Sequence, residues 1–313
     1  TWSSRVSFIG NWSYPLCSLI AMGLTPLISA EWNWRVQLLI PAILSLIATA
    51  LAWRYFPESP RWLESRGRYQ EAEKVMRSIE EGVIRQTGKP LPPVVIADDG
   101  KAPQAVPYSA LLTGVLLKRV ILGSCVLIAM NVVQYTLINW LPTIFMTQGI
   151  NLKDSIVLNT MSMFGAPFGI FIAMLVMDKI PRKTMGVGLL ILIAVLGYIY
   201  SLQTSMLLIT LIGFFLITFV YMYVCYASAV YVPEIWPTEA KLRGSGLANA
   251  VGRISGIAAP YAVAVLLSSY GVTGVFILLG AVSIIVAIAI ATIGIETKGV
   301  SVESLSIDAV ANK

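Results

Sequence analysis

The chain has 313 residues, of which 57% are hydrophobic and only 12% are charged, and its mean hydropathy is +0.78. Charged residues alone make up about a quarter of an ordinary soluble domain, so a soluble core cannot hide this much apolar surface, and we expect the chain in a lipid bilayer. The net charge of +6 does not indicate nucleic-acid binding, because Lys and Arg stand singly at the ends of apolar runs, where they act as topology signals.

The residue types argue against catalysis. Histidine is absent, which removes the commonest metal ligand and the commonest acid–base group at neutral pH. Cys17, Cys125 and Cys225 each lie within an apolar run and lack metal-binding spacing. The sequence contains no His-Glu-x-x-His, Gly-x-Ser-x-Gly or phosphate-binding loop. We therefore expect no catalytic residues, no metal and no cofactor, and we do not expect an enzyme.

Apolar segments long enough to cross a hydrocarbon core of about 30 Å, which takes about 20 residues, occur eight times. They lie near residues 6–30, 36–56, 120–146, 155–177, 184–202, 206–232, 244–267 and 272–295. If Arg5 faces the cytoplasm, nearly all Lys and Arg fall in the alternate loops 54–119, 179–183 and 241–243, as the positive-inside rule requires. We predict an all-α polytopic membrane protein whose linker and C-terminal tail are cytoplasmic.

The spans divide the chain into four predicted parts. Residues 1–56 hold two helices, 57–117 form a cytoplasmic linker, 118–296 form a six-helix bundle and 297–313 form the tail. The linker is patterned for short amphipathic helices over 64–81, and is either a solvated connector or a helical collar that links two halves. Because the chain begins at Thr1 in the middle of this pattern, without an initiating Met, we expect a fragment or a mature product.

Arg253 is the charge predicted deepest in the membrane. It lies ten residues beyond Arg243, which at about 1.5 Å per residue places it about 15 Å into the bilayer. A cation at that depth is costly and should face a watery cavity or a partner. Two interpretations are open: a contact for an anionic substrate group or a carboxylate, or a structural pairing with carbonyls or a snorkelling side chain.

Uncharged polar side chains gather in two of the predicted spans. Several in the third span fall near one helical face, as expected of a cavity lining, and the sixth span is rich in Tyr. Interhelical hydrogen bonding is the alternative role. With Arg253, the candidate substrate-binding residues are Asn131, Gln134, Tyr135, Asn139 and Tyr223.

Glycines four residues apart permit close helix crossing. Such pairs occur at Gly165–Gly169 and at Gly252–Gly256. Close packing is the role that this spacing favours, and gating is the alternative.

Two cytoplasmic turns carry opposite charges. One holds Asp178 and Arg182, and the other holds Glu234, Glu239 and Arg243. They are either solvated loops or a conformational latch whose salt bridges form in one state only. Glu58 and Arg61, just after the second span, can pair with these turns and complete the predicted latch.

Three motifs resemble those of sugar-porter-like members of the major facilitator superfamily. They are Pro57 to Leu63 (Pro-Glu-Ser-Pro-Arg-Trp-Leu), the turn Asp178 to Lys183, and Pro233 to Glu239 followed by Leu242-Arg243-Gly244. Lys179 and Pro181 depart from the Asp-Arg-x-Gly-Arg-Arg turn of that family. The resemblance implies helices five to twelve of a twelve-helix transporter, and hence an N-terminally truncated major facilitator fold with eight transmembrane helices.

The resemblance also bears on the substrate. Residues 131–139 offer no good copy of the Gln-Gln pair and Gly-x-Asn pattern of sugar porters, whereas Asn139 to Pro142 and Gly252 to Gly256 are similar to the metabolite, organic-ion and synaptic-vesicle-type branches. The implied function is alternating-access transport of an organic acid, organic cation or vitamin-like metabolite across the plasma membrane, or across the inner membrane of a bacterium.

The resemblance implies coupling to protons, and we expect a monomer. No Asp or Glu lies within the last six spans, so a proton-accepting carboxylate is expected in helices outside this chain. Sugar–proton symport is one alternative function. A non-transporting receptor or structural homologue of the same fold is the other.

Overall fold

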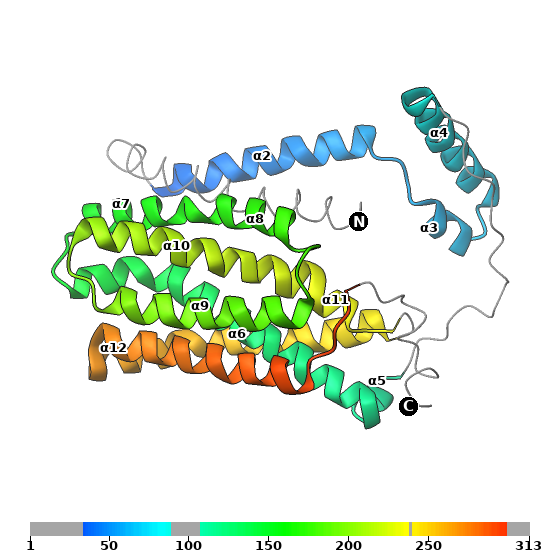
Figure 1. Cartoon of the computed structure of the whole chain (residues 1–313). Coiled ribbons are helices and arrows are strands. Elements are labelled where there is room, and N and C mark those ends of the chain that lie inside the picture. The colour runs from blue at the N-terminus through cyan, green and yellow to red at the C-terminus, as the bar shows by residue number, and fades with distance from the viewer. Residues whose placement is uncertain (1–33, 89–106, 238–239, 299–313) are drawn as a thin grey trace. The chain divides into compact units, whose positions relative to one another are not determined.

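The computed structural model describes residues 34–88, 107–237 and 240–298, and these residues form helices joined by turns (Figure 1). They fall into two compact units, one containing α2 to α4 and the other containing α5 to α12. Each unit is described by itself. The first predicted span at 6–30, the C-terminal tail from residue 299 and Glu239 lie outside the described residues.

The smaller unit contains three helices. α2 (Trp34–Tyr55) is apolar and coincides with the second predicted span, and α3 (Pro60–Ser65) and α4 (Tyr69–Thr87) follow it. Leu63 of α3 and Ala72 of α4 are buried where the two short helices meet. α4 ends at Gly88, whose positive φ of 64° lets its N–H bond to the Ile84 carbonyl. An amphipathic helix therefore occupies the part of the linker where the sequence predicts one.

The larger unit is a bundle of long apolar helices. The short α5 (Tyr108–Leu111) precedes α6 (Gly114–Thr147), which is followed by α7 (Leu152–Met163), α8 (Gly165–Val176) and α9 (Arg182–Ser201). α10 (Met206–Cys225) continues through the π-helix η1 (Tyr226–Tyr231) into α11 (Val232–Glu234), and α12 (Lys241–Ile293) closes the bundle. Five described stretches are long and apolar enough to cross a membrane: 114–147, 152–176, 182–201, 206–234 and 241–293.

α12 accounts for two crossings. Its 53 residues would span about 80 Å as a straight helix, far more than a hydrocarbon core of about 30 Å. Gly271 interrupts it with φ 65° and ψ −162°, a conformation that other residues rarely adopt. The chain reverses direction there (Figure 1), between the predicted spans 244–267 and 272–295. Bundle residues described by the structure thus make six crossings.

Small residues bring the helices of the bundle close together. A Cβ atom added at Gly165 or Gly169 of α8 would overlap backbone carbonyl oxygens of α10, at Phe214 and Thr218. At Gly252 of α12, an added Cβ would lie 2.8 Å from the Leu127 Cβ of α6. Both glycine pairs therefore lie at helix crossings, as the packing interpretation of their spacing predicts.

Candidate functional site

Arg253 and Tyr135 form a hydrogen-bonded pair on the surface of the bundle unit. The Arg253 Nη1 donates to the Tyr135 hydroxyl over 2.6 Å, which joins the first half of α12 to α6. Arg253 is exposed and Tyr135 half-buried. Arg253 is the thirteenth residue of α12, about 18 Å along the helix, so the pair lies well inside the apolar stretch.

Close packing on either side of Arg253 holds this pair in position. An added Cβ at Gly252 would lie 3.0 Å from the Asn131 Nδ2, and one at Gly256 would lie 3.2 Å from the Tyr135 Cδ2. The two glycines thus let the α12 backbone approach α6 at successive turns, with Arg253 between them. The guanidinium is therefore carried on a rigid crossing rather than on a loop.

The other candidate binding residues occupy different environments. Asn131 and Gln134 are buried in α6, and Asn139 is exposed one turn beyond Tyr135. The Asn131 Nδ2 donates to the Leu127 carbonyl over 2.7 Å, while its Oδ1 has no hydrogen-bond partner among the residues described. Tyr223 is buried between α10 and α6, where its hydroxyl donates to the Val126 carbonyl over 3.1 Å. The structure thus brings Asn131, Tyr135 and Arg253 together and keeps Tyr223 in the packed interior.

Arg182 and Glu234 form the centre of a charged cluster at one end of the bundle. The guanidinium at the start of α9 donates through Nε over 3.1 Å and through Nη2 over 3.2 Å to the two Glu234 oxygens. Its Nη1 donates to the Met177 carbonyl, and Asp178 lies 3.7 Å away. The Arg182 side chain is only 7% exposed and that of Glu234 36%. This is the two-pronged geometry in which Arg–carboxylate pairs are strongest.

Glu296, which follows α12, caps the first turn of α9. Its carboxylate accepts the N–H of Arg182 over 2.8 Å and the N–H of Lys183 over 3.1 Å, two donors that a helix start leaves unsatisfied. Burial acts to raise the pKa of Glu296, but the backbone donors of Arg182, Lys183 and Lys298 and the charge of Arg182 outweigh it. The pKa therefore lies below its ordinary value.

Two neighbours of Glu296 extend the cluster. The Thr297 hydroxyl donates to Glu234 over 2.6 Å, and the Lys298 Nζ donates to the Lys179 carbonyl over 2.6 Å. Sequence reasoning assigned residues 297–313 to a tail and missed this role. The acidic and hydroxyl side chains directly after the last apolar run were the available signal, but their partners lie more than 60 residues away along the chain.

The remaining latch candidates are less closely engaged. The Arg243 guanidinium stacks over the Tyr108 ring, 5.2 Å from its centroid. Glu58 is exposed in the smaller unit. The Arg61 side chain and Glu239 lie outside the part of the chain that is described. Within the bundle, the ion pairs described join Arg182 to Glu234 and Asp178.

The segment Pro233 to Trp236 serves both the charged cluster and the apolar core. Glu234 extends to Arg182, whereas Trp236 is buried against the α12 backbone at Gly244, where an added Cβ would overlap its ring. Trp236 and Ile235 also lie against Gly123 of α6. The short segment therefore fixes the end of α11 to α6, α9 and α12 together.

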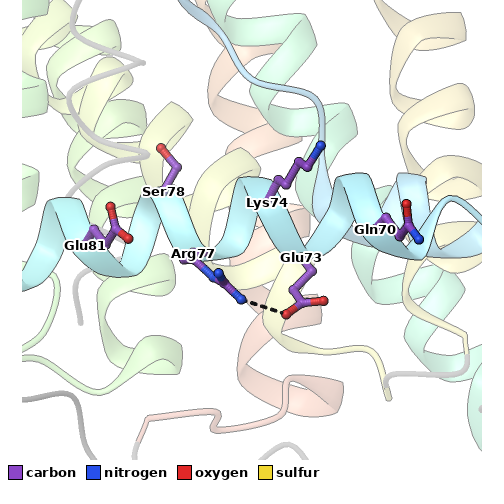
Figure 2. Close-up of a pocket in the computed structure, with 6 residues that line it drawn as sticks. All are labelled: Gln70, Glu73, Lys74, Arg77, Ser78 and Glu81. Carbon is purple, nitrogen blue, oxygen red and sulfur yellow. Dashed lines mark hydrogen bonds and ion pairs between the residues drawn. The ribbon is translucent and has the colours of Figure 1, made fainter.

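Two grooves elsewhere in the described residues fit a metabolite site less well than the surface around Arg253 and Tyr135. One, of about 390 Å³, runs along the polar face of α4 in the linker (Figure 2), where Arg77 pairs with Glu73 over 3.1 Å. Its lining residues come from that single helix: Gln70, Glu73, Lys74, Arg77, Ser78 and Glu81. The other, of about 440 Å³, lies between α9 and the second half of α12. Its lining is apolar apart from Tyr198, so it offers little to orient a polar molecule.

No group of three or more Cys, Asp or Glu side chains gathers within the described ranges in a way that could hold a metal ion. The arrangement instead offers a hydrogen-bonded cation on the bundle surface, well along an apolar helix, and a network of ion pairs at the bundle's end. The chain is a multi-pass integral membrane protein.

Comparison with known proteins agrees with this class. The sequence matches the family model described as Major Facilitator Superfamily over residues 4–260. It is 44% identical over 307 residues to the inner membrane metabolite transport protein YdjE of Escherichia coli, covering 97% of this chain and 67% of the relative. It is 29% identical to the putative metabolite transport protein YyaJ of Bacillus subtilis, and the match covers 88% of this chain and 60% of the relative. The niacin transporter NiaP of Acinetobacter baylyi is 25% identical, and the match covers 92% of this chain and 65% of that protein.

Solved structures show the same fold. A double-tryptophan variant of XylE superposes with a TM-score of 0.70 at 17% identity, covering 96% of this chain and 66% of that one. The proton:xylose symporter XylE bound to 6-bromo-6-deoxy-D-glucose gives a TM-score of 0.64 at 20% identity, with 96% and 66% covered. The chain spans about two thirds of the length of these proteins.

The fold is therefore that of a helical membrane transporter. The chain belongs to the Major Facilitator Superfamily, a family of transporters rather than enzymes. This confirms the family and the all-α polytopic fold class expected from the three motifs.

Proposed function

We propose that the protein is a secondary transporter that moves a small metabolite across the membrane by alternating access. The observation that carries this proposal is the Arg253–Tyr135 pair, a hydrogen-bonded cation exposed on the bundle surface deep within the membrane-spanning region. A charge at that depth is costly unless it serves a solute pathway or a partner. Transporters with paired helical bundles hold their substrate near the midplane.

The substrate-binding residues in this proposal are those on the α6 and α12 faces around the pair. Asn131, Gln134 and Asn139 of α6 are proposed as further members of the site with Arg253 and Tyr135. Tyr223 is assigned to the same region, and its hydroxyl becomes available to a solute only if its bond to the Val126 carbonyl breaks. A small metabolite is favoured over a sugar because the relatives YdjE and YyaJ are metabolite transport proteins by name. A sugar remains the second candidate, since XylE, whose fold is shared, is a proton:xylose symporter.

The charged cluster is proposed to be a conformational latch. Arg182 and Glu234 fasten α9 to α11, and Glu296 fastens the segment after α12 to α9. Asp178 and Arg243 belong to the same group of residues, with Glu58, Arg61 and Glu239 as further members. Such ion pairs can hold one of two bundle arrangements and release in the other.

The remaining assignments follow from the predicted topology. The linker 57–117 and the tail from residue 297 are placed in the cytoplasm, and the six-helix bundle 118–296 in the plasma membrane, which for a bacterial protein is the inner membrane. Proton coupling is proposed by analogy with XylE, and a monomer is proposed as the working unit. The name of YdjE supports the membrane assignment.

Uptake by cells that make the protein tests the proposal. Labelled organic acids, organic cations and sugars are supplied with and without a protonophore. Saturable uptake of an acid or a cation, abolished by the protonophore, is expected. Uptake of sugars alone would contradict the metabolite proposal and support sugar transport, the second candidate. A protein that binds a solute in detergent but transports nothing from the panel would support the receptor alternative.

A further inference from the structure

The Arg253–Tyr135 pair offers hydrogen-bond donors and a positive charge, and it carries no negative charge. The guanidinium carries five N–H groups and cannot be deprotonated in a protein, and one nitrogen is occupied by the Tyr135 oxygen. Because that oxygen accepts the bond, the phenol proton of Tyr135 is free to donate to a third group. In the described part of the chain, no ion pair involves Arg253. An anionic group such as a carboxylate can accept from both donors and also balance the guanidinium charge.

Among the described helices of the bundle, no acidic side chain lies at the depth of Arg253. Acidic residues within the described helices α6 to α12 are Asp154, in the first turn of α7, and Glu234, at the end of α11. Both stand at helix ends, away from the depth of Arg253. A cationic solute beside Arg253 would instead meet a like charge, which repels it. The charge distribution therefore discriminates between anions and cations.

The surface beside the pair is apolar and aromatic. Ile257 and Tyr261 follow Arg253 at intervals of four residues, so the three side chains lie on one face of α12. Ile257 is 68% exposed and Tyr261 74% exposed. From Arg253 to Tyr261 the helix rises about 12 Å. This face suits a small molecule with one charged end and an apolar or aromatic body.

We infer that the substrate is a monocarboxylate with an apolar or aromatic body, whose carboxylate is bound by Arg253 and Tyr135 and whose body lies along Ile257 and Tyr261. This inference rests on the proposed transport function and narrows it. One carboxylate is specified because Arg253 is the single cation among the described residues deep in the first half of α12. The Gly252 and Gly256 contacts hold the α12 backbone close to α6, and the bond to Tyr135 orients the guanidinium.

Binding to the purified full chain in detergent tests the inference. Benzoate, phenylacetate and hexanoate are titrated, each beside its uncharged amide, and benzylammonium is the matched cation. The unfolding temperature is read from tryptophan fluorescence. We expect the carboxylates to raise it in a saturable way, and the amides and benzylammonium to leave it unchanged. A benzamide or benzylammonium shift equal to that of benzoate would overturn the inference.

Variants assign the effect to the site. Arg253→Gln should weaken carboxylate binding at least about tenfold. Arg253→Lys should weaken it less, because the charge remains while the forked geometry is lost. Tyr135→Phe should weaken it by a few fold. Lys153→Gln, which removes an exposed charge at the start of α7, should change nothing. If Arg253→Gln does not fold, Arg253→Lys and Tyr135→Phe still show whether carboxylate binding depends on the pair. Carboxylate binding that all three variants retain would contradict the assignment.

The uptake panel separates failure of the inference from failure of the proposed function. If a sugar or an organic cation is transported and no carboxylate binds, the inference is wrong and the transporter function stands. If no solute is transported and none binds, both fail. Transport of a carboxylate that is lost with Arg253→Gln and kept with Lys153→Gln supports both.

Discussion

The Arg182 guanidinium meets the Glu234 carboxylate through two parallel hydrogen bonds, of 3.1 Å and 3.2 Å, although the residues stand 52 positions apart. Arg182 is nearly buried, so this pair ties the first turn of α9 to the end of α11 with little competition from water. The segment after α12 joins the same cluster through Thr297 and Glu296. Three helix ends are thus fastened at one point.

The first prediction concerns the stability of this cluster. Glu234→Gln should lower the free energy of unfolding by about 1–3 kcal/mol, because it leaves the buried Arg182 charge without its carboxylate. Thermal unfolding in detergent measures the change. Arg68→Gln is the control, since Arg68 and Glu71 form an exposed pair at the start of α4 and such pairs contribute little to stability. Equal effects of the two substitutions would contradict a buried latch.

The second prediction separates the latch from the substrate site. Glu234→Gln should slow transport severalfold while the substrate affinity stays nearly the same, because the cluster biases the conformational equilibrium without touching the solute. Asp178→Ala should have a smaller effect on turnover, since Asp178 is half-exposed and 3.7 Å from Arg182. Turnover and binding are measured separately on reconstituted protein. Loss of binding in a well-expressed Glu234→Gln protein would count against the latch.

The third prediction is a pH dependence that arises from Glu296. Its folded-state pKa is lowered, so its contribution to stability is present above the unfolded pKa of about 4.3 and is lost as the pH falls through the folded value. Glu296→Gln should therefore destabilise the protein at neutral pH, and the difference from the unchanged protein should shrink as the pH is lowered below about 4. Unfolding temperatures across this range test it. A difference that is constant with pH would mean that the Glu296 charge does not matter.

The fourth prediction concerns the crossing that carries Arg253. Gly252→Ala should destabilise the protein by about 1–3 kcal/mol and weaken substrate binding, because the new Cβ would lie 2.8 Å from the Leu127 Cβ. Gly246→Ala, six residues earlier in α12, meets nothing within 4 Å and should be neutral or stabilising by up to about 1 kcal/mol. Thermal unfolding and ligand titration compare the two. Similar behaviour of both variants would argue against a tight α6–α12 crossing.

Much of the fold could be predicted from the sequence, because a bilayer imposes helices of known length. The apolar runs at 120–146 and 206–232 lie within α6 and within α10 with its continuation. The reversal near residue 271 was foreseen as a break between two spans. The backbone is helical on both sides of Gly271, with no longer loop between them. The short interruption at Phe164, between α7 and α8, is followed by Gly165 and Pro167, which are poor helix formers, but the apolar run continues through it.

The candidate site could be predicted only in part. Arg253 was selected for its depth and Tyr135 for its place on a polar helical face, but their 2.6 Å bond depends on how two helices cross, which no local pattern specifies. Arg182 and Glu234 were assigned to one latch because opposite charges stood in two turns. Glu296 was missed, since a carboxylate that caps a distant helix looks like any solvated tail residue. Long-range partners of this kind become visible only in the folded bundle.

The most direct test of the central claim measures uptake by cells making the Arg253→Gln variant, beside the Lys153→Gln control at matched membrane expression. If the pair on α6 and α12 is the solute site of a secondary transporter, Arg253→Gln should lower the uptake efficiency, kcat/KM, at least about tenfold, and Lys153→Gln should leave it unchanged. Uptake by Arg253→Gln equal to that of the control would contradict the claim.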